Sequence, residues 1–111
     1  MATRTVSPIR TLRTKLGLGR VEFGRLIGAS ERSIADWERG ESPRQAHARL
    51  LSQLERVYAT ASKVMKPEFI GTWLETPLEE LGGLKPREAM ERGEHDRVWR
   101  ILFAIESGGY R

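Results

Sequence analysis

The chain has 111 residues, contains no cysteine and carries a formal net charge of +4. A chain of this length forms one domain, or two very small regions that share a core. The lack of cysteine excludes disulfides and thiolate metal sites, and the lack of an apolar run of about 18 residues predicts a cytoplasmic protein with no membrane partner.

The charge is distributed unevenly between the two halves of the chain. Residues 1–60 hold 11 Lys and Arg against 6 Asp and Glu, whereas residues 61–111 hold 8 against 9. Ten of the 11 basic residues in the first half are Arg, whose guanidinium forks onto phosphates and guanine edges. This bias favours nucleic acid as the partner of the first half and protein as the partner of the second. The alternative is a charged face that only meets solvent.

Hydrophobic periodicity predicts an all-α chain, because no segment alternates like a strand for long enough. The expected elements are an arm at 1–6 and helices at 7–16, 20–27, 31–39, 42–65, 67–74, 76–81, 86–92 and 94–107. The helix to residue 65 is the longest and predicts a rod of roughly 35 Å between the two halves.

Helix starts and stops are read from capping residues. Ser30 is expected to cap the helix that follows the Gly28-Ala29 turn, and Gly40 to end that helix as a left-handed cap. Capping-box patterns predict further helix starts at Ser42 and Thr76.

Residues 16–40 resemble the helix-turn-helix of the phage-repressor-like, or Xre, family. The match rests on Leu16-Gly17-Leu18, the Gly28-Ala29-Ser30 turn, and Ile34, Trp37, Glu38, Arg39 and Gly40 of the second motif helix. Two amphipathic helices with a glycine turn also occur in enzymes and helix bundles. The chain departs from the family at Gly24, where alanine is usual and glycine costs about 1 kcal/mol of helix propensity. It also departs at Gly19, which offers no side-chain cap.

The resemblance implies that the second motif helix enters the major groove of DNA. The DNA-binding candidates are Arg20, Glu31, Arg32, Ser33, Asp36, Arg39 and Arg44. Arg32 is suited to guanine, and Arg39 and Arg44 to phosphates. Glu31 and Asp36 face the same polyanion, so they either accept from a cytosine amino group or weaken binding.

The second half resembles the toxin-binding domain of antitoxins of the Xre/MbcA/ParS group. The matching residues are Trp73-Leu74, Thr76-Pro77, Leu81-Gly82-Gly83, Pro86, Glu88, Gly93, Val98, Leu102, Ile105-Glu106, Gly108 and Tyr110. The resemblance implies a flexible N-terminal arm at 1–6, a helix-turn-helix DNA-binding region at 7–65, and a toxin-binding region with a C-terminal tail at 66–111.

This family resemblance implies a defined biology. Its antitoxins bind and inhibit a RES-domain toxin, encoded beside them, that consumes NAD or transfers ADP-ribose from it, and they repress the shared operon. The C-terminal tail commonly blocks the NAD pocket, which here makes Gly108, Gly109, Tyr110 and Arg111 toxin-binding candidates. The alternative is a frayed end, as at most termini.

The tryptophans are interpreted as core or toxin-contact residues, and the histidines give no evidence of a metal site or of catalysis. Trp37 and Trp73 are expected in the core, whereas Trp99 is either core or an anchor for the toxin. His47 and His95 share no metal-ligand spacing, and no nucleophile accompanies His95-Asp96. We therefore expect no catalytic residue, no metal, no cofactor and no enzymatic activity.

Two functions from different classes remain. The first is an antitoxin that inhibits its toxin and autorepresses its operon; the second is a plain dimeric repressor with no toxin partner. Operator binding by either is expected to need a homodimer, through the long helix near Tyr58 or through exposed apolar residues, and the antitoxin is expected to form a hetero-oligomer with its toxin. A small enzyme, the third class, would require a catalytic cluster that the sequence lacks.

Overall fold

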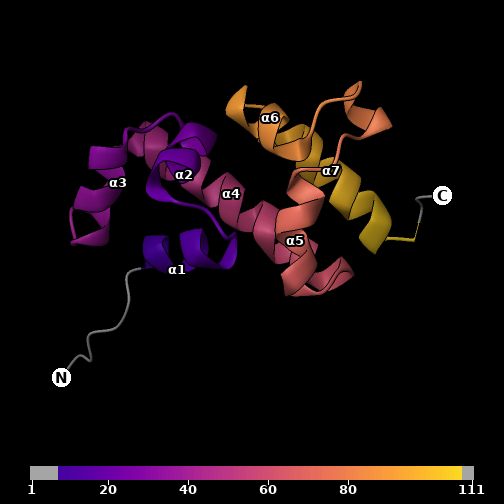
Figure 1. Cartoon of the computed structure of the whole chain (residues 1–111), viewed down its shortest axis with the longest axis horizontal. Helices are drawn as coiled ribbons and strands as arrows, with labels where there is room; N and C mark the ends of the chain where they lie inside the picture. Colours follow the sequence, from indigo (N-terminus) through magenta and orange to yellow (C-terminus); the bar gives the residue numbers. More distant parts are fainter. Residues whose placement is uncertain (1–7, 109–111) are drawn as a thin grey trace.

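The computed structural model describes residues 8–108, and within them it contains only helices (Figure 1). The elements are α1 (Pro8–Lys15), α2 (Arg20–Ile27), α3 (Glu31–Glu38), α4 (Gln45–Val64), α5 (Pro67–Leu74), a 3-10 helix η1 (Glu79–Leu81), α6 (Pro86–Glu91) and α7 (His95–Glu106). The predicted all-α fold class is confirmed. The predicted arm at 1–6 and three of the tail residues, 109–111, lie outside the described residues.

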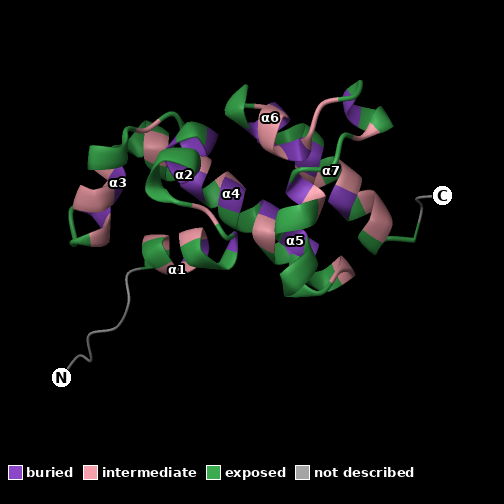
Figure 2. Cartoon of the chain, in the orientation of Figure 1, coloured by how far each residue is buried: buried purple, intermediate pink, exposed green. Residues whose placement is uncertain are grey.

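Helix α4 runs through the middle of the molecule and both halves pack on it. In Figure 1, α1, α2 and α3 gather around one end of α4, and α5, α6 and α7 around the other. Its 20 residues make a rod of about 30 Å. Helix α7 makes the most extensive contact with α4, and α2 also touches α6. The buried residues therefore form one continuous core across the two halves (Figure 2).

The α2–turn–α3 unit has the local structure that its sequence predicts. Phe23 and Ile34 are fully buried between the helices. The Ser30 hydroxyl accepts a hydrogen bond from the Ser33 backbone N–H at 3.1 Å, which confirms the predicted cap. Gly28 has a φ of +70°, a conformation that glycine adopts without a steric penalty.

Two predicted helix starts are wrong. Helix α4 begins at Gln45, not at Ser42, because Arg44 is still extended and no side chain caps the helix. The Thr76 pattern opens no α-helix: only η1 forms, and the Thr76 hydroxyl donates instead to the Thr72 carbonyl, 2.7 Å away, at the end of α5. In both cases proline follows the predicted cap, but the residue before the first helical position, Arg44 or Leu78, is extended and gives no side-chain cap.

His95 joins the second half of the chain to α2. Its side chain is 1% exposed, and Nε2 donates a hydrogen bond to the Leu26 carbonyl oxygen of α2 at 2.9 Å. Burial lowers the pKa of His95, although the carbonyls of Leu26 and Gly93 oppose this shift. A neutral, buried imidazole thus fixes the start of α7 against α2, a link across 69 residues of sequence.

Gly24 is required at the contact between the two motif helices. A Cβ atom added to Gly24 would overlap the carbonyl oxygen of Ala29 and lie 3.2 Å from the carbonyl carbon of Ala29. Both atoms belong to the backbone of the turn, which is held by a hydrogen bond from the Ala29 N–H to the Gly24 carbonyl at 2.8 Å. In this chain the turn leaves no room for a side chain at position 24, so the cost of Gly24 in helix propensity cannot be recovered by substituting alanine.

We predict that Gly24→Ala destabilises the protein by about 1–3 kcal/mol, because the methyl group forces the Ala29 backbone to move. Helix propensity alone would predict the opposite sign, a gain of about 1 kcal/mol. Urea denaturation followed by circular dichroism distinguishes the two.

Gly71→Ala is the matched control, since Gly71 is also helical but exposed. The nearest atom to its added Cβ is the Leu16 carbonyl oxygen at 3.9 Å, an ordinary contact. This variant should be more stable by about 0.5–1 kcal/mol. Equal gains from both variants would contradict the steric account of Gly24.

Candidate DNA-binding and toxin-binding surfaces

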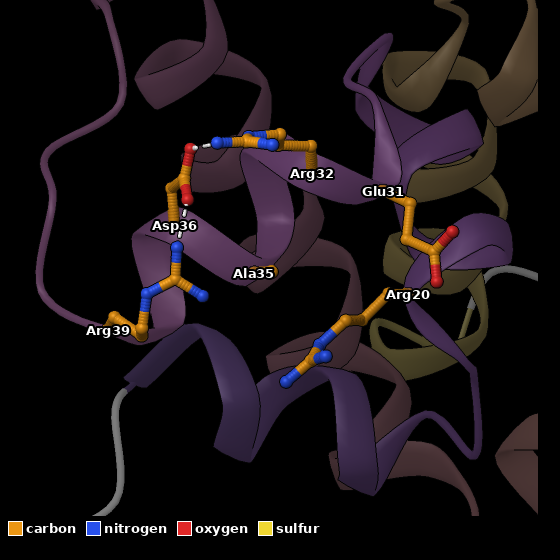
Figure 3. Close-up of a pocket in the computed structure, with 6 residues that line it drawn as sticks. All are labelled: Arg20, Glu31, Arg32, Ala35, Asp36 and Arg39. Atoms are coloured by element: carbon orange, nitrogen blue, oxygen red, sulfur yellow. Dashed lines mark hydrogen bonds and ion pairs between the residues drawn. The ribbon is translucent and has the colours of Figure 1, made fainter.

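A shallow hollow on the outer face of α3 brings five of the seven DNA-binding candidates together (Figure 3). It is lined by Arg20, Glu31, Arg32, Ala35, Asp36 and Arg39. Arg20 begins α2, and the others lie on α3 or directly after it. The hollow is therefore polar, with three guanidinium groups and two carboxylates on one face.

The other two DNA-binding candidates lie outside this hollow. Ser33 is half-buried in the cap of α3, where its hydroxyl lies 3.1 Å from that of Ser30. Arg44 is exposed at the position before α4 and has no ion pair within the described part of the chain. Arg44 is thus a cation free to meet an anion, whereas Ser33 is partly committed to the fold.

The arginines beside α3 are paired with the acid of the same helix. Asp36 Oδ2 lies 3.9 Å from Arg32 Nε, and Asp36 Oδ1 accepts a hydrogen bond from Arg39 Nη2. The negative charge of Asp36 was difficult to reconcile with a DNA-binding face. In the structure this charge is balanced by Arg32 and Arg39 of the same chain.

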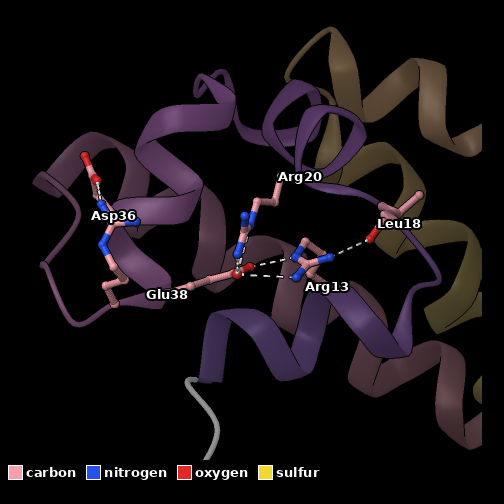
Figure 4. Close-up of polar contacts among 6 residues, drawn as sticks. Arg13, Leu18, Arg20, Asp36 and Glu38 are labelled. Atoms are coloured by element: carbon pink, nitrogen blue, oxygen red, sulfur yellow. Dashed lines mark hydrogen bonds and ion pairs between the residues drawn. The ribbon is translucent and has the colours of Figure 1, made fainter.

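Glu38, which the sequence analysis used only as part of the family pattern, organises the contacts between three helices (Figure 4). Its carboxylate is 3% exposed and accepts hydrogen bonds from Arg13 Nε at 2.6 Å and from Arg20 Nη2 at 3.0 Å. Arg13 also donates to the Leu18 carbonyl at 3.1 Å. One carboxylate thereby joins α1, the start of α2 and the end of α3. A partner 25 positions away gives no local signal in sequence.

The charge state of Glu38 follows from these contacts. Burial acts against its ionisation, but hydrogen bonds from Arg13 and then Arg20, with their positive charges, outweigh burial and hold the pKa of Glu38 below its ordinary value. Glu38 is therefore ionised at neutral pH and confines Arg20, a DNA-binding candidate, to the edge of the hollow.

The second candidate surface lies along α7, near its C-terminal end. The Trp99 indole packs on α4: Nε1 donates to Thr60 Oγ1 at 3.1 Å, and the Arg56 guanidinium lies 3.7 Å from the ring centroid. The Phe103 ring stacks on Trp99 with a centroid distance of 4.9 Å and remains 49% exposed. Trp99 is thus half-buried, with its indole packed on α4 and under an exposed aromatic ring. Its predicted role as an anchor for the toxin stays a prediction.

The chain leaves α7 through a left-handed glycine. Gly108 has a φ of +78°, and its N–H donates to the Ile105 carbonyl at 3.1 Å. The other three tail candidates, Gly109, Tyr110 and Arg111, lie outside the described residues.

No metal centre or membrane span is found in residues 8–108. No group of three His, Asp or Glu side chains in this range is arranged to hold a metal ion. His47 lies against Trp37, with a centroid distance of 5.2 Å, and its Nε2 is 3.2 Å from the Gly28 carbonyl oxygen, so it supports the turn. None of the described helices is long and apolar enough to cross a membrane.

Comparison with known proteins gives a match over nearly the whole chain. No family model matches it. The mycobacterial cidal antitoxin MbcA of Mycobacterium bovis and that of Mycobacterium tuberculosis are each 30% identical to it over 95 residues, which is 85% of this chain and 84% of the relative. A chain in the crystal structure of the M. tuberculosis MbcT–MbcA toxin–antitoxin complex superposes with a TM-score of 0.77 at 28% identity, covering 95% of this chain and 96% of that chain.

We predict that Glu38→Gln destabilises the protein by about 2 kcal/mol, because charged hydrogen bonds are lost and Arg13 is left partly buried without its counterion. Because the folded pKa of Glu38 lies below its unfolded value, its contribution is complete above about pH 4.5 and is lost as the pH falls through the folded pKa. Thermal unfolding of wild type and variant should therefore converge as the pH is lowered from 7 toward the acid range.

Glu75→Gln is the matched control. Glu75 also accepts from an arginine, Arg87, at 2.6 Å, and this hydrogen bond lowers its pKa, but its side chain is half exposed. The loss should stay below about 1 kcal/mol. Equal losses for both variants would contradict an organising role for Glu38.

Proposed function

Because this chain belongs to the family of MbcA antitoxins, we propose that it inhibits a toxin encoded beside it and represses their shared operon. The toxin is of the RES-domain type and consumes NAD or transfers ADP-ribose from it. The family relationship points to a regulatory protein and not to a catalyst.

The extent of the similarity is the observation that carries this proposal. The match to the chain from the toxin–antitoxin complex spans both the helix-turn-helix and the second half. A plain repressor would share the helix-turn-helix alone, since many folds carry that motif. The second half also bears the glycine, proline and tryptophan pattern that resembles a toxin-binding domain, which favours the antitoxin over the plain dimeric repressor.

The C-terminal tail is the part of the chain proposed to block the NAD pocket of the toxin. Gly108 follows the last turn of α7 in a left-handed conformation, which does not continue an α-helix. Tyr110 then provides a flat ring with a polar tip, and Arg111 provides a guanidinium and a carboxylate. These groups suit a pocket that binds an aromatic base and phosphates.

The exposed side of α7 is proposed to extend this toxin contact. Phe103 lies five residues before Gly108, which is about 7.5 Å along a helix. A protein interface covers about 800 Å² on each partner, so a toxin that holds the tail also covers the last turns of α7. The exposed Phe103 ring, supported by Trp99, is the aromatic group available there.

The helix-turn-helix is proposed to bind operator DNA through α3 and the cations around it. Arg44 and the hollow on α3 supply contacts to phosphates and base edges. One motif makes few such contacts, so we propose a homodimer that reads two half-sites. The shallow groove between α1 and α4, lined in part by Leu12 and Tyr58, is a candidate for its interface.

We predict that deleting residues 109–111 abolishes inhibition of the toxin while the fold and DNA binding remain. The neighbouring gene product is purified, and its NAD consumption is measured alone, with an equimolar amount of this chain, and with the truncated chain. Full-length protein should suppress NAD loss, and the truncated protein should not. Complete inhibition by the truncated chain would contradict the tail mechanism, and a neighbour that consumes no NAD would contradict the proposed toxin class.

We predict that Arg44→Ala weakens DNA binding to a similar degree on all sequences and lowers the slope of log K against log salt by about 1, because one phosphate contact is lost. Fluorescence anisotropy with the duplex upstream of its own gene, over a range of KCl concentrations, measures this.

The two variants serve as reciprocal controls. Arg44→Ala should still inhibit the toxin, and the tail deletion should still bind DNA. A wild-type chain that binds no duplex at low salt would contradict the repressor role while leaving the inhibitor role standing.

A further inference from the structure

We propose that Asp36 is an internal brake on DNA binding: its carboxylate holds Arg32 of α3 and Arg39, directly after α3, away from DNA until a phosphate or base displaces it. This inference rests on the proposed DNA-binding function and adds a residue that sets its strength.

The geometry places one carboxylate between two guanidinium groups (Figure 3). Arg32 lies one helical turn before Asp36, and Arg39 lies three residues after it, so all three share one face. Each carboxylate oxygen serves a different arginine: Oδ2 lies 3.9 Å from Arg32 Nε, and Oδ1 accepts from Arg39 Nη2.

The exposure of the three side chains shows which of them is fixed. The Asp36 side chain is 22% exposed, whereas those of Arg32 and Arg39 are 87% and 67% exposed. The carboxylate is therefore the anchored partner, and the two arginines fold back over it from solvent.

These contacts compete with those that DNA requires. A guanidinium that reads guanine or clasps a phosphate uses two N–H groups side by side. Asp36 already engages Nη2 of Arg39 and lies near Nε of Arg32. Its charge also faces the same hollow that a phosphate would approach, so binding has to break the ion pairs and overcome a like charge.

The other two acids of α3 differ from Asp36. Glu38 is turned away from the hollow and holds Arg13 and Arg20 inside the fold. Glu31 lines the hollow but is exposed and has no ion pair with any described residue. Glu31 thus places a negative charge on the same helix without pairing with an arginine, which makes it a matched control for Asp36.

The test compares Asp36→Asn with Glu31→Gln, each of which removes one negative charge from α3 with little change of shape. Both are made in the wild-type chain and in the Arg32→Ala/Arg39→Ala background. Affinity for the duplex upstream of its own gene, and for a mixed-sequence duplex, is measured by anisotropy at low salt. Circular dichroism and the thermal midpoint verify folding, with Asp36→Ser as a second variant.

The brake predicts an effect that depends on the two arginines. Asp36→Asn should tighten binding by about five-fold in the wild-type chain, and this gain should disappear when both arginines are absent. The gain from Glu31→Gln should be the same in both backgrounds, because it arises from charge alone.

Two results would overturn the brake, and they are distinguishable. If Asp36→Asn gives the same gain with and without the arginines, Asp36 acts only as a charge, while DNA binding itself stands. If no variant binds either duplex at low salt, the proposed DNA-binding function fails and the brake fails with it.

Discussion

The packing of α7 along α4 is the interaction on which the rest of the structure depends. Leu54 of α4 and Val98 and Leu102 of α7 are fully buried, in the same core that holds Phe23 of α2. The hydrogen bond from His95 to the α2 carbonyl adds a fixed point between the halves. Because burial keeps that imidazole neutral, the link carries no charge that would have to be desolvated. The two candidate surfaces therefore belong to one body, and neither half is free to turn against the other without opening the core.

Under the proposed DNA-binding function, pairing inside the protein determines how much positive charge would be available to DNA. The excess of arginine in residues 1–60 indicates a nucleic-acid partner, yet four of these arginines, Arg13, Arg20, Arg32 and Arg39, lie beside two acids of α3. Glu38 uses its pair to build the fold, whereas Asp36 holds its pair at the surface. Net charge from composition thus overstates the field that a phosphate meets. An exposed cation without an ion-pair partner, such as Arg44, therefore contributes more to the positive potential at the surface than a paired arginine does.

Local signals predicted most of the helices, and non-local contacts explain what was missed. The Ser30 cap, the Gly28 turn and the burial of Trp37 follow from short-range patterns, and they are found as predicted. The predicted helix starts at Ser42 and Thr76 were wrong, because a capping pattern is compatible with a helix start but is not sufficient to form one. The contacts of Glu38 and His95, with partners 25 and 69 residues away, leave no periodic trace. Gly24 is the clearest case: propensity counts it as a cost, and only the position of the Ala29 carbonyl shows that no side chain fits. The candidate DNA-binding residues could be gathered onto one face from helical spacing, but their ion pairs could not.

The placement of the two surfaces bears on how inhibition and repression would work together. Helix α3 and the last turn of α7 lie toward opposite ends of the molecule, whose longest dimension is 47 Å (Figure 1). A toxin held at the end of α7 would then leave α3 open, so the proposed inhibition and DNA binding would not compete for the same surface. If Asp36 restrains the arginines as proposed, one copy of the chain would bind DNA weakly. Linking several copies in one assembly raises the effective concentration of the second motif once the first is bound, so affinity grows without any new contact. Under the proposed function, the toxin-bound oligomer is therefore the stronger repressor, and free antitoxin the weaker one.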